Sequence, residues 1–182
     1  LALATVADIV PLLDENRVLV KLGLEAMATP RVGLAALLQV AGLEGRPSAG
    51  QLGFQLGPRI NAGGRMDASG KSVELLTTED PALAARIAQD LDDNNLARKQ
   101  AEDTMLRQAL SKVTREVRLN ETRALVLWQD DWNSGVLGIV ASRLVERFHR
   151  PVVLLAREED GYHGSARSIP GVHLYQALCR CR

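Results

Sequence analysis

Residues 80–117 read DPALAARIAQDLDDNNLARKQAEDTMLRQALSKVTREV, and this stretch decides how the chain is organised. A row of positions three or four residues apart, which would fall on one side of a helix, contains Leu83, Ile87, Leu91, Asn94, Arg98, Ala101 and Met105. No Gly or Pro occurs from Ala82 to Thr122. The pattern predicts one helix over about 80–117. That length exceeds the roughly 8–20 residues usual in globular proteins, so we expect the helix to connect two units rather than lie on the surface of one.

The sequence before this helix predicts short elements separated by turns. In order we expect a strand over 1–9 that ends at Asp8, helices over 14–27 and 32–40, a loop over 42–50 and a short helical stretch over 50–57. Asp14 is the predicted N-cap of the first of these helices. Residues 57–65, GPRINAGGR, contain too much glycine to predict regular structure.

The sequence after the helix alternates between strand and helix patterns. The expected elements are strands over 124–128, 151–156 and 163–168 and helices over 135–148 and 174–181. Strands that alternate with helices imply layers of both kinds, so the predicted fold class is α/β.

The composition describes a globular protein without an overall charge bias. Hydrophobic residues make up 46% and charged residues 24%, and acidic and basic residues number 22 each. A nucleic-acid site would therefore have to be a local basic cluster. No apolar run approaches the roughly 20 residues of a membrane span. The chain lacks an initial Met and a secretory signal, and both ends look like cuts inside a larger protein.

The two cysteines, Cys179 and Cys181, are separated by a single residue. This spacing is too short for a zinc knuckle and unfavourable for a structural disulfide. We interpret them as the reduced thiols of a cytosolic protein.

Asp8 ends the predicted first strand, in TVADIVP over 5–11. A carboxylate at the carboxyl end of a strand is where α/β folds place ligand-binding groups, and hard cations such as Mg²⁺ and Mn²⁺ take oxygen ligands. The alternative is that Asp8 caps the following turn.

Two arginines and an amide lie in the glycine-rich segment: Arg59, Asn61 and Arg65. Small residues let a polyanion approach the backbone, and Arg binds phosphate through paired hydrogen bonds. The alternative is a tight turn whose arginines pair with Asp or Glu.

A third group lies on the last predicted strand, in GSARS over 164–168. Side chains alternate along a strand, so Ser165 and Arg167 are expected to share a face. One interpretation is that they clamp one phosphate, with Ser168 next to them. The alternative is a solvated edge strand whose Arg pairs with Glu158 or Glu159.

Glycines also begin the helix predicted over 135–148, in WNSGVLGIVASRL over 132–144. A helix start exposes N–H groups and a positive dipole end to an anion. The alternative is that small residues let this helix lie close to a sheet.

The three histidines show no metal-ligand spacing, so we assign no metal to His149, His163 or His173.

Together these segments resemble RecJ exonucleases of the DHH phosphoesterase superfamily, in order and over nearly the whole chain. The matching segments are ATVADIVPL over 4–12, LDENR over 13–17, LGFQLGPRINAGGRM over 52–66, LDDNNLAR over 91–98, GVLGIVASRL over 135–144, RFHRPVV over 147–153 and GSARS over 164–168. The resemblance implies the C-terminal part of a DHH domain over 1–79, a connecting helix over 80–120 and the N-terminal part of a DHHA1 domain over 121–182.

The resemblance also implies 5′→3′ degradation of single-stranded DNA in repair and recombination, with two divalent metals, Mn²⁺ or Mg²⁺. By position Asp8 corresponds to one metal ligand. Ser165, Arg167 and Ser168 correspond to residues that grip DNA and its 5′ phosphate, and Arg59, Asn61 and Arg65 to a basic segment facing the DNA. Helicases and single-strand-binding proteins are the implied partners, in the cytoplasm and not at a membrane.

The chain also departs from the family pattern. The Asp-x-Asp and Asp-His-His motifs, which supply the other metal ligands, are absent and are expected before residue 1. Asn133 stands where the family usually has His. One Asp does not hold two ions, so we expect the chain to be inactive alone and its parent to be an enzyme.

Two alternative functions stay open. The first is a DHH/DHHA1 phosphodiesterase for oligonucleotides or cyclic dinucleotides, and segment 57–65 argues against it. The second is a catalytically dead nucleic-acid scaffold, which Asp8 disfavours.

Overall fold

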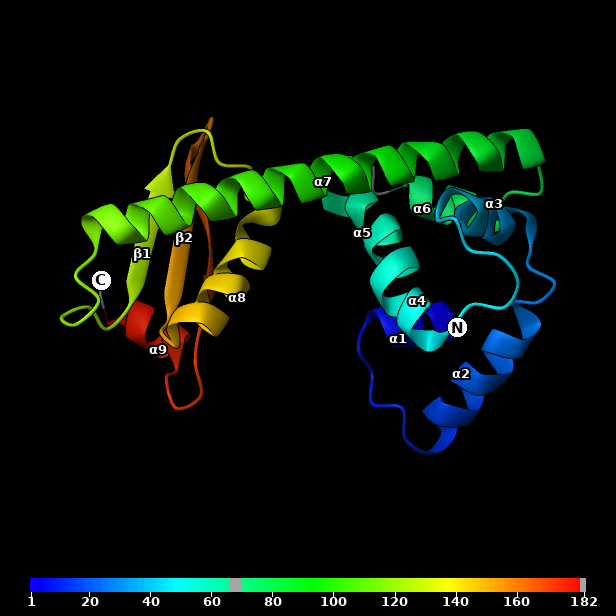
Figure 1. Cartoon of the computed structure of the whole chain (residues 1–182), viewed down its shortest axis with the longest axis horizontal. Helices are drawn as coiled ribbons and strands as arrows, with labels where there is room; N and C mark the ends of the chain where they lie inside the picture. Colours follow the sequence, from blue (N-terminus) through cyan, green and yellow to red (C-terminus); the bar gives the residue numbers. More distant parts are fainter. Residues whose placement is uncertain (66–69, 181–182) are drawn as a thin grey trace. The chain divides into compact units, whose positions relative to one another are not determined.

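The computed structural model describes residues 1–65 and 70–180, except for the side chain of Arg65. The chain divides into two compact units, Leu1–Arg98 and Lys99–Arg182. The boundary falls inside one helix, α7 (Pro81–Glu116), which is drawn in green in Figure 1. The predicted long helix is therefore confirmed, and it contributes residues to both units.

The first unit is helical. Its elements before α7 are α1 (Ala2–Ala7), α2 (Asp14–Ala26), α3 (Val32–Val40), α4 (Ala49–Gln51), the π-helical turn η1 (Leu52–Leu56), α5 (Gly57–Arg65) and α6 (Lys71–Thr77). Its largest fully buried side chains are Leu37, Leu52, Leu56, Leu75 and Leu91. The prediction of α3 is confirmed at both ends. Helix α2 also forms, but Leu13 occupies its N-cap position, and the predicted cap Asp14 is its first residue.

The predicted strand over residues 1–9 is wrong, because this segment forms α1. The Thr5 amide donates to Leu1 O at 3.0 Å and the Asp8 amide to Ala4 O at 2.9 Å. Periodicity does not separate a short buried helix from a buried strand when most positions are apolar. A helix satisfies its own backbone donors. A strand needs a partner strand, and the described part of the first unit contains no strand.

The glycine-rich segment over 57–65 was also predicted wrongly, since it forms the helix α5 rather than an irregular loop. Gly57 permits a close helix contact here. A Cβ atom on Gly57 would lie 3.1 Å from the Cβ atom of Ala7 in α1. The glycine thus brings α5 against the helix that ends at Asp8, and this contact places both segments around one cavity described below.

The second unit is a small α/β layer, as predicted. It contains β1 (Leu125–Gln129), the 3₁₀ turn η2 (Ser134–Val136), α8 (Leu137–Phe148), β2 (Val152–Glu158), β3 (Gly161–Arg167) and α9 (Leu174–Cys179). Strand β2 lies between β1, to which it is parallel, and β3, to which it is antiparallel. The C-terminal half of α7 and all of α8 share one hydrophobic core with the sheet.

The register decides which residues of β3 face that core. Leu154 of β2 pairs with Leu127 on one side and with Ser165 on the other, and both leucines are buried. Because side chains alternate along a strand, Ser165 and Arg167 lie on the face of the sheet that α8 covers. Trp132, which follows β1, is also buried, and its indole N–H donates to Gln108 Oε1 at 2.8 Å.

Among the described residues, every helix is too short or too polar to span a bilayer.

Candidate functional site

The end of β3 holds the Arg167 guanidinium next to a hydroxyl. Arg167 Nη1 donates to Ser165 Oγ at 3.1 Å and to the carbonyl of Ala166 at 2.8 Å. The predicted shared face of Ser165 and Arg167 is therefore confirmed. Within the described residues Arg167 forms no ion pair with a carboxylate, so the alternative pairing with Glu158 or Glu159 is not observed.

The first turn of α8 closes over this pair of side chains. A Cβ atom on Gly138 would lie 2.7 Å from Arg167 Nη2 and 3.1 Å from Ser165 Oγ. Real Cβ contacts essentially never fall below 3.0 Å, so glycine lets the helix approach the guanidinium. The two sequence groups at 132–144 and 164–168 thus meet at one place. We call Gly138, Ser165 and Arg167 the β3 clamp.

Its chemistry suits a phosphate. The guanidinium presents several N–H donors in one plane, the hydroxyl adds another, and the N-terminal end of a helix carries partial positive charge. Asn133 helps to form this end, because its Oδ1 accepts a hydrogen bond from the Gly135 amide at 2.9 Å.

Ser168 points elsewhere. Its hydroxyl donates to the carbonyl of Val172 at 2.7 Å and so stabilises the turn that follows β3. A contact between Ser168 and nucleic acid stays a prediction.

In the first unit, a cavity of about 520 Å³ collects two of the predicted residues, Asp8 from the end of α1 and Asn61 from α5. Arg31 and Gly57 also line this cavity. Sequence reasoning missed Arg31, which directly precedes α3 and belongs to no recognisable motif. The helix contact at Gly57 explains how residues 8 and 61 come together.

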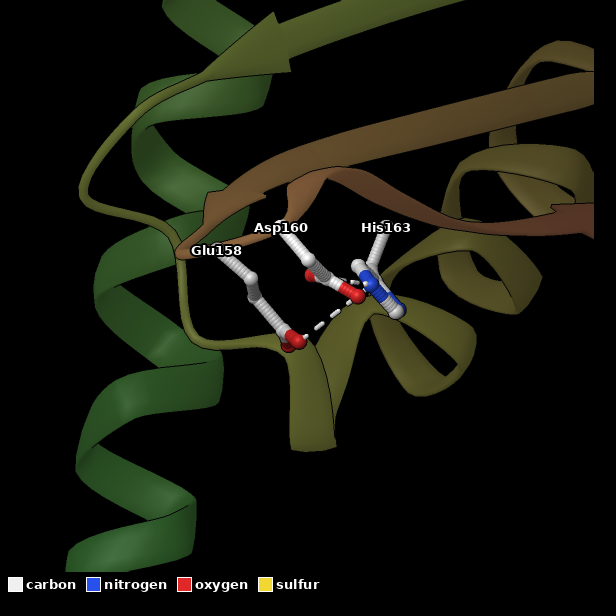
Figure 2. Close-up of side chains that lie close together, drawn as sticks. All are labelled: Glu158, Asp160 and His163. Carbon is white, nitrogen blue, oxygen red and sulfur yellow. Dashed lines mark hydrogen bonds and ion pairs between the residues drawn. The ribbon is translucent and has the colours of Figure 1, made fainter.

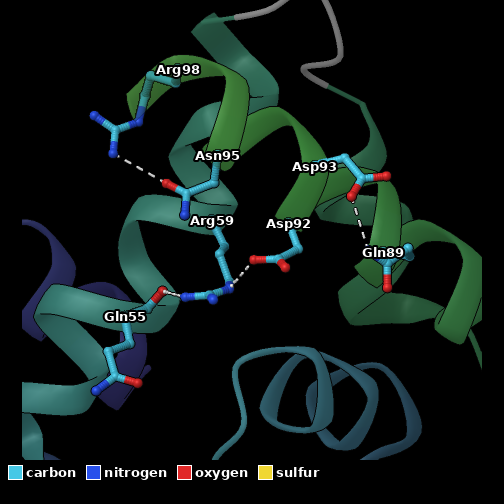
Figure 3. Close-up of polar contacts among 7 residues, drawn as sticks. All are labelled: Gln55, Arg59, Gln89, Asp92, Asp93, Asn95 and Arg98. Atoms are coloured by element: carbon cyan, nitrogen blue, oxygen red, sulfur yellow. Dashed lines mark hydrogen bonds and ion pairs between the residues drawn. The ribbon is translucent and has the colours of Figure 1, made fainter. Parts of the chain in front are cut away.

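Arg59, by contrast, pairs with other groups of the protein. Its Nε atom lies 2.7 Å from Asp92 Oδ1 in α7, and its Nη1 donates to the carbonyl of Gln55 at 2.8 Å (Figure 3). Its side chain is only 14% exposed. This is the alternative expected from the sequence, an arginine paired with an acidic residue. The side chain of Arg65 lies outside the described residues.

Asp8 does not complete a metal site with its described neighbours. Two-metal centres need several oxygen and nitrogen ligands. Among the described residues, no group of three His, Cys, Asp or Glu side chains within reach of one ion includes Asp8. The role of Asp8 as a metal ligand therefore stays a prediction.

The chain is similar to known proteins over its whole length. Residues 121–181 match the DHHA1 domain family. The single-stranded-DNA-specific exonuclease RecJ of Bacillus subtilis is 42% identical over 100% of this chain, and that of Dickeya dadantii is 44% identical over 98%. The crystal structure of Thermus thermophilus RecJ in complex with Mn²⁺ matches 99% of the chain with a TM-score of 0.84 and 36% identity.

The chain belongs to the RecJ family. The resemblance inferred from the sequence motifs is thereby confirmed, and so is the fold class. A crystal structure of exonuclease RecJ bound to manganese also matches, with a TM-score of 0.83 over 98% of the chain, and another Thermus thermophilus RecJ structure contains Mg²⁺. The chain spans 23% of the length of the Bacillus RecJ and 32% of that of the Dickeya RecJ, so it corresponds to a part of these enzymes.

Proposed function

We propose that this RecJ-family chain is part of a 5′→3′ single-stranded-DNA exonuclease that acts in DNA repair and recombination in the cytoplasm. The observation that carries the proposal is the β3 clamp. Its guanidinium lies beside a hydroxyl and a helix start, and no described carboxylate neutralises it. The RecJ relatives, which are named for single-stranded DNA, support this substrate.

We propose that three segments of the chain correspond to different parts of the enzyme. Residues 1–79 form the end of a DHH domain, 80–120 the connection and 121–182 the beginning of a DHHA1 domain. Asp8 supplies one ligand to a centre of two divalent metals, Mn²⁺ or Mg²⁺, which would polarise the phosphodiester and activate a water. The solved RecJ structures with these ions support the choice of metal. With one ligand present, the chain alone is inactive.

The β3 clamp would set polarity. A terminal phosphate carries more negative charge than an internal one, so paired hydrogen bonds from Arg167 and a third from Ser165 favour a 5′-phosphorylated end. Asn61 lies in the Asp8 cavity and would face the DNA there together with Arg65, while Arg59 would support this region through Asp92. Helicases and single-strand-binding proteins are the proposed partners.

The test is the substitution Arg167→Lys in the complete protein that contains this chain. Lysine keeps the charge but loses the planar fork, so exonuclease rates should fall more on 5′-phosphorylated than on 5′-hydroxyl single strands. Arg157→Lys, the same change on the neighbouring strand β2 but on the opposite face of the sheet, is the matched control and should show no such difference. Equal losses on both substrates would exclude the clamp.

Asp8 has a separate test in the same complete protein. Asp8→Ala should abolish cleavage and leave DNA binding largely intact, because Asp8 is proposed to hold a metal rather than a phosphate. Cleavage that survives this substitution would show that the metal site lies elsewhere.

A further inference from the structure

The tip of the β2–β3 hairpin gathers three side chains that the function above does not use. His163 Nε2 lies 3.0 Å from Asp160 Oδ1 and 3.6 Å from Glu158 Oε2, and Figure 2 shows the imidazole facing both carboxylates. One ligand atom from each residue lies within 4.8 Å of the others. We call Glu158, Asp160 and His163 the hairpin triad.

The hairpin itself brings the hairpin triad together. Glu158 pairs with Gly161, so the turn contains only two residues. Gly161 has φ +138°, a value that side chains with a Cβ rarely adopt. Glu158 is two positions after Ala156, and His163 pairs with Ala156, so both side chains lie on the same face of the hairpin. Asp160 reaches them from the turn.

The distances fit ligands that share one ion. Zinc binds imidazole nitrogen and carboxylate oxygen at about 2.0–2.2 Å, which places neighbouring ligand atoms about 3.0–3.5 Å apart. The distance from His163 Nε2 to Asp160 Oδ1, 3.0 Å, which is also a hydrogen bond, lies in this range, and the distance to Glu158 Oε2, 3.6 Å, lies just above it. The imidazole matters most, because carboxylates alone suit hard cations, whereas a nitrogen ligand favours first-row transition ions.

The negative charge of the hairpin triad is not balanced by a Lys or Arg side chain among the described residues. Within the described residues, neither Glu158 nor Asp160 pairs with a Lys or Arg. The nearest arginine in sequence, Arg157, is 3.7 Å from Asp130 instead. Asp130 also accepts a hydrogen bond from the Tyr162 hydroxyl, which raises the pKa of Tyr162 above its ordinary 10.0. The acidic Glu159 in the turn adds further negative charge.

We propose that the hairpin triad binds one divalent first-row transition ion, of which Zn²⁺ is the probe of choice. His163 supplies nitrogen, Glu158 and Asp160 supply oxygen, and water completes the coordination. The site is formed by residues of the second unit alone, whereas Asp8 belongs to the first unit. It does not depend on the exonuclease proposal, because it requires only residues of this hairpin.

The test is titration of the full 182-residue chain with ZnCl₂ by calorimetry. The protein carries Cys179→Ser and Cys181→Ser, because thiols bind zinc. We expect one ion per chain. His163→Ala and Glu158→Gln should each weaken binding at least tenfold. The matched control is Glu159→Gln, which removes the same charge from the adjacent residue of the hairpin without removing a proposed ligand, and it should change the affinity less than twofold.

Several outcomes would overturn the proposal. They are the absence of saturable binding, an unchanged affinity in His163→Ala, and equal losses in Glu159→Gln and Glu158→Gln. The same titration with Mg²⁺ tests whether the site binds a hard cation equally well. If Mg²⁺ binds as tightly as Zn²⁺ and independently of His163, the hairpin is merely an acidic surface. Far-UV circular dichroism checks that each variant is folded, and ¹⁵N NMR of the His163 ring reports ligation at Nε2 without any substitution.

Discussion

Arg59 in α5 and Arg167 in β3 are two arginines in small-residue segments, and both were predicted to bind phosphate. In the structure Arg59 is 14% exposed and lies 2.7 Å from Asp92. Arg167 is exposed and donates hydrogen bonds to a hydroxyl and a backbone carbonyl, and it has no carboxylate partner among the described residues. The difference shows that similar local sequences place one arginine against a carboxylate and leave the other without one among the described residues. We therefore expect substitutions of the two arginines to have opposite kinds of effect.

A third arginine, Arg143 in α8, extends the comparison and should show the largest effect. Its Nη2 lies 2.6 Å from Oε1 of Glu102, whose side chain is only 4% exposed. Arg143→Met removes one contact of a buried carboxylate and should lower the free energy of unfolding by about 2–3 kcal/mol. Chemical denaturation followed by circular dichroism measures the change. Arg147→Met, on an exposed position of the same helix, is the control, and an equal loss there would contradict this account.

Arg59→Met should have the next largest effect. Asp92 retains 29% exposure and so is partly hydrated once its partner is lost, which limits the destabilisation to about 1–2 kcal/mol. The same denaturation experiment measures it. Because an apolar pair often replaces an ion pair at little cost, adding Asp92→Leu should recover part of the loss. No recovery would mean that Arg59 contributes through its contact with Gln55 instead.

Gly138→Ala should separate binding from stability. The new Cβ atom meets the movable end of Arg167, and alanine favours a helix over glycine by up to about 1 kcal/mol. We expect unfolding free energy that is unchanged or raised by less than about 1 kcal/mol. In the complete protein, the preference for a 5′ phosphate should be lost because Arg167 is displaced. Fluorescence anisotropy with phosphorylated and unphosphorylated oligonucleotides measures this preference, and a retained preference would argue against the β3 clamp.

Arg167→Met should have the smallest effect on stability, within about 0.5 kcal/mol, because an exposed arginine without an acidic partner contributes little to folding. Denaturation midpoints of this variant and of the unsubstituted chain provide the measurement. A loss as large as that of Arg59→Met would remove the distinction between the two arginines.

The parts of the fold that the sequence predicted well are those with a repeating pattern. The 36 residues of α7 supply many turns of one periodicity, and α3 is bounded clearly by Pro30 and Gly42. The segment at 1–9 is too short and too uniformly apolar to distinguish helix from strand. In α5 the glycines suggested a loop, although Gly57 serves close packing against Ala7.

The candidate sites were predictable only where neighbours in sequence are also neighbours in space. Ser165 and Arg167 share a strand face, and alternation alone brings them together. The partner of Arg59 lies 33 residues away at Asp92, and Gly138 is far in sequence from the side chains it accommodates. The hairpin triad was missed for a different reason: its residues are close in sequence, but a search for known metal-ligand spacings does not include the register of a two-residue hairpin.

The tryptophans give the two units different optical properties. Both tryptophans of the chain, Trp128 and Trp132, lie in the second unit, and the first unit has none. Trp132 is 5% exposed and hydrogen-bonded to Gln108, so its emission should shift to longer wavelength when water reaches it. Trp128 is 53% exposed and should contribute a nearly constant background. Tryptophan fluorescence therefore follows unfolding of the second unit alone, whereas the helical signal follows both, and a difference between the two curves would resolve their separate melting without any label.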